Sequence, residues 1–278
     1  MAVWIQYILP KKALTQLAGR LASLQGGWWT TKAIAWFIRR YGVDMSEAAQ
    51  PEASAYETFN AFFTRPLRVG ARPMGNSTWV SPVDGAISQL GPLENGTLLQ
   101  AKGHTYTASA LLGGSQEAAQ PYENGYFATL YLSPKDYHRI HMPCAGELRR
   151  MTYVPGELFS VNPSTAAAVP GLFARNERVV CDFDTDFGPM SLVLVGATVV
   201  GSIQTTWHGV VNPPRLDAPK VWEYAPGQVR LARGDEMGRF LLGSTVIILW
   251  GSAGVRFTQE WTPGAAIRMG QNMAKMEE

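Results

Sequence analysis

The chain has 278 residues, of which 46% are hydrophobic and 17% are charged, so it can form one large domain or one domain with an appended segment. Two cysteines, Cys144 and Cys181, are too few for a framework of disulfide bonds, and no cleavable secretory signal is visible, which fits a reducing, cytoplasmic setting. No run reaches the roughly 18 apolar residues that a membrane-spanning helix needs, so we expect nothing in the chain to cross a membrane.

The net charge of +2 is unevenly distributed along the chain. The first 43 residues carry +6 and contain no acidic residue, which leaves −4 for residues 44–278. The basic residues of the N-terminal segment are Lys11, Lys12, Arg20, Lys32, Arg39 and Arg40. The same segment holds four of the nine tryptophans, Trp4, Trp28, Trp29 and Trp36, and a row of leucines at helical spacing, Leu14, Leu17, Leu21 and Leu24.

Basic, tryptophan-rich amphipathic helices suit the surface of an anionic bilayer, because cations meet the head groups and indoles settle at the boundary. The alternatives are a helical subdomain that packs its leucines on the core, or a basic face that binds nucleic acid. We do not expect nucleic acid as a partner, because the rest of the chain is acidic and offers no basic stripe.

Three helices are predicted in the N-terminal region, at roughly 11–25, 28–41 and 44–65. The first ends at two glycines. In the third, Ser54 and Glu57 have the spacing of a capping box, and phenylalanines supply an apolar face.

From about residue 79, short β-rich runs alternate with turn signals such as Asn95-Gly96 and Asn124-Gly125. The predicted strands are Trp79–Val83, Tyr126–Leu132, Arg178–Phe183, Met190–Ile203 and the apolar run after Ser244. We expect the polar tail from about residue 263 to be loosely ordered. The predicted fold class is α+β, with an N-terminal amphipathic helical region (1–66) and a β-dominated catalytic core (67–278).

The densest polar cluster is Ser133–Pro143, where His138 and His141 are three residues apart and would share a face of a helical turn. A zinc site would need at least a third ligand, and neither His104 nor His208 forms an evident set with them, so we predict no metal. The two histidines either bond to loop backbone or perform acid–base chemistry, for which the pKa of histidine is suited.

Two more residues could take part in such chemistry. The dipeptide Asp84-Gly85, taken alone, predicts a turn. Ser244, directly after Gly243 in an apolar run, is either a turn-former before a strand or a nucleophile aimed at the preceding peptide bond. A serine, a histidine and an aspartate are the parts of a nucleophile–base–orienter set, although their spacing does not show that they meet.

In combination, the motifs resemble the phosphatidylserine decarboxylase family of the bacterial type. The resemblance rests on Leu242–Thr245 and Asp136–Pro143, with support from Tyr153–Asn162, Phe173–Arg178, Val195–Ile203 and Gly234–Phe240. It covers nearly the whole chain from about residue 55, and the basic, helical N-terminus is also typical of the family.

The resemblance implies a proenzyme that cuts itself between Gly243 and Ser244. Ser244 would be the nucleophile, His141 its base and Asp84 the residue that orients the imidazole. Formation of an ester, followed by β-elimination, would divide the chain into a β chain (1–243) and an α chain (244–278). Ser244 would become a covalent pyruvoyl group, which is the expected cofactor.

The implied reaction is decarboxylation of phosphatidylserine to phosphatidylethanolamine and CO2, through a Schiff base between the pyruvoyl group and the serine amine. His138 would donate a proton to the substrate or position it, and His208 is a lesser candidate for lining the pocket. The resemblance further implies a peripheral protein on the cytoplasmic side of the cell membrane, formed by the β and α chains and able to dimerise.

Two other functions compete with this interpretation. One is a serine hydrolase or self-cleaving protease that uses Ser244, His141 and Asp84 without a prosthetic group, although Ser244 lacks the Gly-x-Ser-x-Gly elbow. The other is a non-enzymatic β-domain at the membrane surface.

Overall fold

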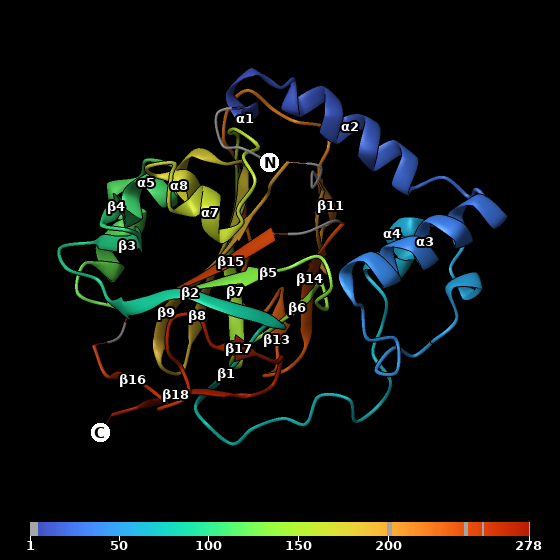
Figure 1. The fold of residues 1–278 in the computed structure, drawn as a ribbon. Coiled ribbons are helices and arrows are strands. Elements are labelled where there is room, and N and C mark those ends of the chain that lie inside the picture. Colours follow the sequence, from blue (N-terminus) through green and yellow to red (C-terminus); the bar gives the residue numbers. More distant parts are fainter. Residues whose placement is uncertain (1–4, 199–201, 242–243, 252, 278) are drawn as a thin grey trace.

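A computed structural model of the chain describes residues 5–198, 202–241, 244–251 and 253–277 (Figure 1). Its centre is a large sheet formed by β2 (Gly85–Pro92), β5 (Tyr126–Leu132), β7 (Gly146–Val154), β8 (Arg178–Thr185), β9 (Gly188–Val195), β12 (Lys220–Glu223), β13 (Arg230–Leu231), β15 (Ser244–Trp250) and β17 (Ala266–Ile267). The strands follow the order β12-β7-β8-β9-β15-β5-β2-β17, with β13 beside β7, and they pair antiparallel. β15 therefore lies in the middle of the sheet.

Smaller elements cover both faces of this sheet. On one side are two short sheets, β1 (Trp79–Val80) with β18 (Asn272–Met276) and β16 (Val255–Phe257), and β11 (Gly209–Asn212) with β10 (Ile203–Thr205), β14 (Glu236–Phe240) and β6 (Arg139–His141). On the other are the hairpin of β3 (Thr97–Ala101) and β4 (His104–Thr107) and the short helices α5 (Ala108–Leu111), α6 (Gln116–Ala119), η2 (Gln120–Tyr122), α7 (Pro163–Ala166) and α8 (Leu172–Arg175). Figure 1 shows α5, α7 and α8 grouped beside the sheet.

The side chains of β15 show why this strand is buried from end to end. Val246, Ile248 and Trp250 join the core on the side of the short sheets, whereas Ile247 and Leu249 join the core on the side of the short helices. A continuous apolar run is typical of a strand covered on both faces. The strand predicted after Ser244 is confirmed, and so is the strand predicted at Tyr126–Leu132.

The N-terminal region forms α1 (Ile5–Ile8), α2 (Lys11–Ala22), α3 (Trp28–Tyr41), η1 (Ala53–Ala55) and α4 (Phe59–Phe63). Of these, α3, η1 and α4 pack around a small core of their own. The first two predicted helices are confirmed by α2 and α3. The predicted helix at 44–65 is wrong. Pro51 disfavours helical backbone around it, and the cap of α4 is Thr58, whose side chain accepts from the Ala61 N–H, rather than Ser54.

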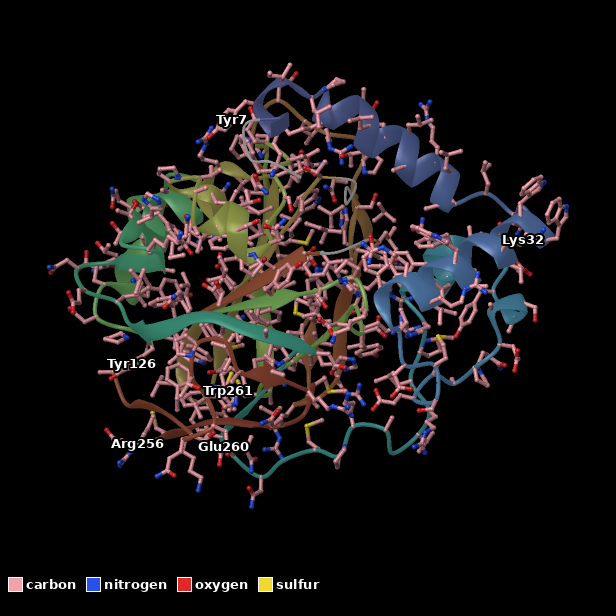
Figure 2. The ribbon with its side chains drawn as sticks, viewed as in Figure 1. Tyr7, Lys32, Tyr126, Arg256, Glu260 and Trp261 are labelled. Atoms are coloured by element: carbon pink, nitrogen blue, oxygen red, sulfur yellow. The ribbon has the colours of Figure 1, made fainter. Side chains whose placement is uncertain are left out.

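The leucines of the α2 segment and the tryptophans of α3 point away from the protein, whereas Ile34 of α3 is fully buried and Phe37 and Ile38 pack against the core that contains it. These leucines and tryptophans are between 37% and 65% exposed, namely Leu14, Leu17, Leu21, Leu24, Trp28, Trp29 and Trp36. The leucines therefore do not pack on the core, and Figure 2 shows Tyr7 and Lys32 at the outer surface of this region. No helix in the described part of the chain is long and apolar enough to span a membrane.

Polar contacts attach this region to the catalytic core. Gln6 is buried, donates to Thr165 Oγ1 at 3.2 Å and accepts from the Ser160 N–H at 2.8 Å. Lys11 pairs with Glu157 at 2.8 Å. α1 and α2 thus dock through polar contacts, while the leucines of α2 stay exposed.

The prediction of a loosely ordered tail is wrong. β17 completes the central sheet at its β2 edge, and β18 pairs with both β1 and β16. Met273 and Ala274 are fully buried, and Trp261 is nearly so. The charged residues that make the tail look polar are on its outside, since Arg268 pairs with Glu47, and Lys275 and Glu277 lie beyond the buried positions.

Two of the predicted strands have different bounds in the structure. Trp79–Val83 is a strand only at its first two residues, and Met190–Ile203 belongs to two strands, β9 and β10, rather than one.

Met273 offers a test of the order of the tail. Met273→Ala should lower the free energy of unfolding by about 2–5 kcal/mol, because the side chain is fully buried. Met276→Ala, on the same strand but 37% exposed, should change it by less than about 0.5 kcal/mol. Urea titrations followed by tryptophan fluorescence measure both values, and equal small effects would show that the tail does not pack as described.

Candidate active site

Ser244 is the first residue of β15 and is held by its partners in the sheet. It pairs with Leu132 of β5, and the register continues without a break to Trp250 and Tyr126. The side chain is 1% exposed, and its Oγ has no hydrogen-bond partner among the described residues. A buried hydroxyl without a partner is uncommon and marks a site where another group is expected. Gly243, the predicted carbonyl side of the cleavage site, lies outside the described residues.

His138 lies on the loop after β5 and is completely buried. Its Nδ1 is 2.8 Å from the carbonyl oxygen of Asp136, and because a carbonyl only accepts, Nδ1 carries the proton. Nε2 therefore holds the lone pair, and no described group donates to it. Burial lowers the pKa of His138 to about 3, so at neutral pH this imidazole is uncharged and its Nε2 can accept a hydrogen bond.

His141, at the end of β6, has the same tautomer but an occupied Nε2. Nδ1 donates to the carbonyl oxygen of Gly234 at 2.8 Å, and the Tyr137 hydroxyl lies 3.0 Å from Nε2. Burial also lowers the pKa of His141, so it too is a neutral base. Its backbone N–H donates to the carbonyl oxygen of Pro82 at 2.9 Å, which places it beside the segment that contains Asp84.

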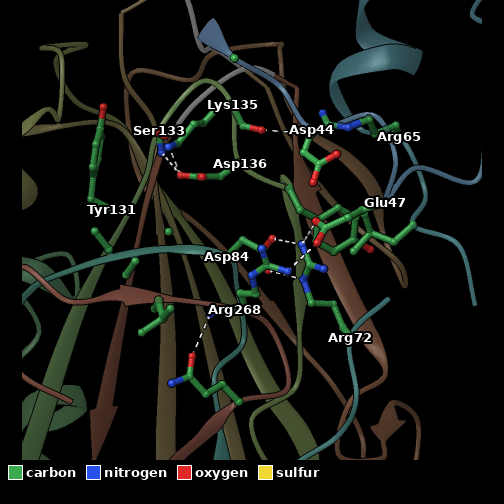
Figure 3. A pocket seen from close by; sticks show the side chains of 18 of the residues that line it. Asp44, Glu47, Arg65, Arg72, Asp84, Tyr131, Ser133, Lys135, Asp136 and Arg268 are labelled. Carbon is green, nitrogen blue, oxygen red and sulfur yellow. Dashed lines mark hydrogen bonds and ion pairs between the residues drawn. The ribbon is translucent and has the colours of Figure 1, made fainter. Parts of the chain in front are cut away.

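Asp84 is held by an ion-pair cluster (Figure 3). Its carboxylate accepts from Arg72 Nε at 3.0 Å, from Arg72 Nη2 at 2.5 Å and from the Met269 N–H at 2.8 Å. Arg72 also pairs with Glu47 at 2.6 Å, and Glu47 in turn pairs with Arg268. Hydrogen bonds to the two carboxylates raise the pKa of Arg72 although burial lowers it, so the guanidinium stays charged.

The structure thus brings the predicted residues into one region without joining them as a triad. The His138 carbonyl oxygen accepts from the Phe240 N–H, four residues before Ser244. No hydrogen bond in the described part of the chain joins Asp84 to His141, or His141 to Ser244. In this conformation Asp84 bonds to Arg72, and His141 bonds to Tyr137 and Gly234.

A cavity of about 660 Å³ lies beside Asp84, whereas His138, His141 and Ser244 are not among the residues that line it. Asp84, Arg72, Tyr137 and Asp136 line it, together with Tyr131, which pairs with Thr245 across the sheet. Figure 3 shows Ser133, Lys135 and Asp136 on one side of this cavity and the Asp84 cluster on the other.

Comparison with known proteins identifies the family. The family model described as phosphatidylserine decarboxylase matches residues 59–275, and one described as PSD matches residues 1–42. A phosphatidylserine decarboxylase proenzyme of Delftia acidovorans is 61% identical over 279 residues, covering 100% of this chain and 98% of the relative. The one of Azoarcus sp. is 61% identical over 276 residues, covering 99% and 96%.

The chain belongs to the phosphatidylserine decarboxylase family. The predicted family is thereby confirmed, and with it the expected class, a decarboxylase made as a proenzyme. The two competing functions, a hydrolase without a prosthetic group and a non-enzymatic domain, have no support from these matches.

Several polar residues of this family member's site were not predicted from sequence. Tyr137 lies within the block that contains both histidines, yet nothing in the sequence indicates that its hydroxyl lies next to His141. Arg72 and Glu47 lie in irregular segments without a motif and acquire their roles only through the fold.

The remaining histidines lie elsewhere. His208 is exposed on the turn between β10 and β11, 4.8 Å from the Trp222 ring, and does not line the cavity beside Asp84. His104 lies in the β3–β4 hairpin. Across the described residues, no three histidine, cysteine or acidic side chains come together as a metal-binding group.

The low pKa of His138 predicts how stability depends on pH. Between about pH 6.5 and about pH 3 the unfolded chain binds a proton at this residue that the folded chain does not. Lowering the pH through this window should therefore cost up to about 1.4 kcal/mol per pH unit. His138→Gln should lose this contribution, so its free energy of unfolding, measured by urea titration between pH 7 and pH 4, should fall less steeply. Parallel curves for the two proteins would refute the neutral, buried imidazole.

Proposed function

We propose that the protein converts phosphatidylserine into phosphatidylethanolamine and CO2 as a self-processed, pyruvoyl-dependent enzyme at the cytoplasmic surface of the cell membrane. The observation that carries the proposal is the pair of buried polar atoms without partners, Ser244 Oγ and His138 Nε2, in a chain of this family. The proposed division of labour assigns Asp84, His141 and Ser244 to self-cleavage and His138 to the lipid.

In the proposed self-cleavage, Ser244 Oγ attacks the carbonyl carbon of Gly243 while His141 Nε2 accepts the hydroxyl proton. The proton then passes to the Ser244 nitrogen as the Gly243–Ser244 C–N bond breaks, which leaves an ester. β-Elimination breaks the bond between the ester oxygen and Cβ of Ser244, releases the Gly243 carboxylate and leaves dehydroalanine, which water converts into the pyruvoyl group with loss of ammonia. The neutral state of His141 supports its role as the base, because only the neutral imidazole has a lone pair to accept a proton. The Tyr137 hydroxyl must first leave Nε2. Asp84 supplies the negative charge that favours the imidazolium once it forms.

The position of Ser244 also explains how the two product chains would stay together. A cut before Ser244 breaks no pairing of β15, which remains bonded to β5 on one side and to β9 on the other. β17 and β18, also from the α chain, pair with β2 and β1 of the β chain. We therefore propose an αβ unit of residues 1–243 and 244–278 that shares one sheet.

Removal of CO2 from an amino acid needs an electron sink, and the pyruvoyl carbonyl supplies it. The residues present fit this group, because Ser244, its source, is buried at a point that lacks a hydrogen-bond partner. His138 Nε2, whose lone pair has no partner, would accept a hydrogen bond from the amine of the lipid and so position its nitrogen. A proton held in that hydrogen bond would pass to the substrate carbon from which CO2 has left, and burial keeps the imidazole neutral before and after the transfer.

Membrane attachment is proposed through the exposed leucines of the α2 segment and the exposed tryptophans of α3. Exposed leucines and tryptophans on two adjoining helices form an apolar surface of the kind that marks an interaction site. The basic residues of the same segment would attract an anionic bilayer, and salt would weaken that attraction.

The two histidines can be separated by experiment. His141→Gln should remain a single uncut chain, whereas His138→Gln should split into two chains and release at least about 100-fold less CO2 from phosphatidylserine vesicles, as expected for loss of an acid–base group. Intact mass and CO2 release measure the two effects. An uncut His138→Gln protein beside a cut His141→Gln protein would reverse the two assignments.

The membrane surface can be tested with matched leucines. Leu21→Ser (58% exposed) should weaken binding to phosphatidylserine vesicles by up to about tenfold, because one buried leucine contributes roughly 1.5 kcal/mol. Leu99→Ser (42% exposed), in the β3–β4 hairpin, should bind as the wild type does. Co-sedimentation with vesicles measures both proteins, and equal binding by both would place the membrane contact elsewhere.

A further inference from the structure

Arg65, just after α4, is a buried cation whose hydrogen-bonding capacity is largely unused. It is 3% exposed, and Nη2 donates to the carbonyl oxygen of Lys135 at 3.1 Å. Nε and Nη1, which together carry three N–H groups, have no acceptor among the described residues. The guanidinium carbon lies 5.4 Å from the centre of the Phe62 ring.

The carboxylates nearest to Arg65 have other partners. Asp84 is bonded to Arg72 and Met269, and Glu47 to Arg72 and Arg268. Asp136 accepts from the backbone and side chain of Ser133. No described carboxylate forms an ion pair with Arg65, and burial lowers the pKa of its guanidinium. An unpaired buried charge is costly, so its retention calls for a partner that arrives with the ligand.

The position of Arg65 relates it to both the cavity and the reacting groups. Arg65 and Lys135 line the cavity of about 660 Å³, and among the described cations there they are the two without a carboxylate partner. Figure 3 shows both residues at the edge of the cavity with Asp44 beside them, and the carboxylate of Asp44 accepts from the backbone and side chain of Ser46. Two residues before Arg65, the Phe63 ring lies 4.1 Å from the His138 ring. The loop Ser133–His138, to which Arg65 is bonded, begins directly after Leu132, the partner of Ser244.

We propose that Arg65 is a binding residue for the phosphodiester of the phospholipid headgroup, with Lys135 beside it. The unpartnered Nε–H and the two N–H groups of Nη1 lie on different edges of the guanidinium, and each edge can donate to an oxygen of an anion. This assignment rests on the proposed function and adds to it the site that recognises the lipid.

The reaction itself indicates which anion Arg65 holds. Phosphatidylserine carries a phosphodiester and a carboxylate, and either could pair with a guanidinium. A cation paired with the carboxylate would stabilise the substrate relative to the transition state, in which that charge is lost, and would slow the release of CO2. A cation paired with the phosphodiester acts equally before and during the reaction and contributes only to binding and orientation.

The test uses the self-processed protein and glycerophosphoethanolamine, a product headgroup that has a phosphodiester but neither a carboxylate nor acyl chains. Calorimetric titration should show Arg65→Met binding it at least about tenfold more weakly than the wild type does. Without ligand, Arg65→Met should have a Tm equal to or higher than that of the wild type, because an unpaired buried charge has been replaced by an apolar side chain. Arg68→Met, three residues away on the surface, should match the wild type in both measurements.

The assignment would be overturned if Arg65→Met bound the headgroup with the affinity of the wild type. It would also be overturned if the Tm of Arg65→Met were well below that of the wild type, because Arg65 would then have a structural role. L-Serine, which has a carboxylate but no phosphodiester, is the second probe, and if its binding alone depends on Arg65 the wrong anion has been assigned. Release of CO2 from phosphatidylserine by the wild type is measured in parallel. An inactive wild type would overturn the proposed function and this assignment together, whereas an active wild type insensitive to Arg65 overturns only the assignment.

Discussion

The arrangement of the site depends on the pairing of β15 between β5 and β9. This strand is buried on both faces, and its register with β5 runs unbroken from Ser244 to Trp250. The residue that the family would convert into its cofactor is therefore fixed by backbone hydrogen bonds at the first position of the most enclosed strand. Chemistry at that position leaves most of the sheet undisturbed, because all pairs of β15 except that of Ser244 with Leu132 lie after Ser244.

Around this fixed point, the fold leaves several polar groups without partners. Ser244 Oγ, His138 Nε2 and two nitrogens of Arg65 are buried and have no hydrogen-bond partner among the described residues. Asp84 and His141, by contrast, are fully bonded, to Arg72 and Met269 and to Tyr137 and Gly234. Self-cleavage as proposed thus requires the existing hydrogen bonds of Asp84 and His141 to be exchanged. The groups assigned to the lipid, by contrast, have no hydrogen-bond partner among the described residues. Self-cleavage therefore needs a rearrangement of the protein, whereas the lipid would bind to groups that are already in place.

The parts of the fold with a strong local pattern could be predicted from sequence. The apolar run after Ser244 and the leucine spacing of α2 are such patterns. The predicted third helix failed because Pro51 interrupts it, and the predicted loose tail failed because Met273 and Ala274 are buried only through pairing with β1 and β16. In the site, motif resemblance selected Asp84, His138, His141 and Ser244 as residues of one region. Arg72, Tyr137 and Arg65 could not be selected, because their roles come from partners far away in the sequence.

The central claim is that Ser244 is the source of the catalytic group, and the most direct test is the intact mass of the purified wild-type protein together with analysis of its N-termini. We predict two chains divided between Gly243 and Ser244, of 243 and 35 residues. The smaller chain should have the mass expected for a pyruvoyl group and no free amine at its N-terminus. A single uncut chain, or a smaller chain that begins with an unmodified serine, would contradict the account.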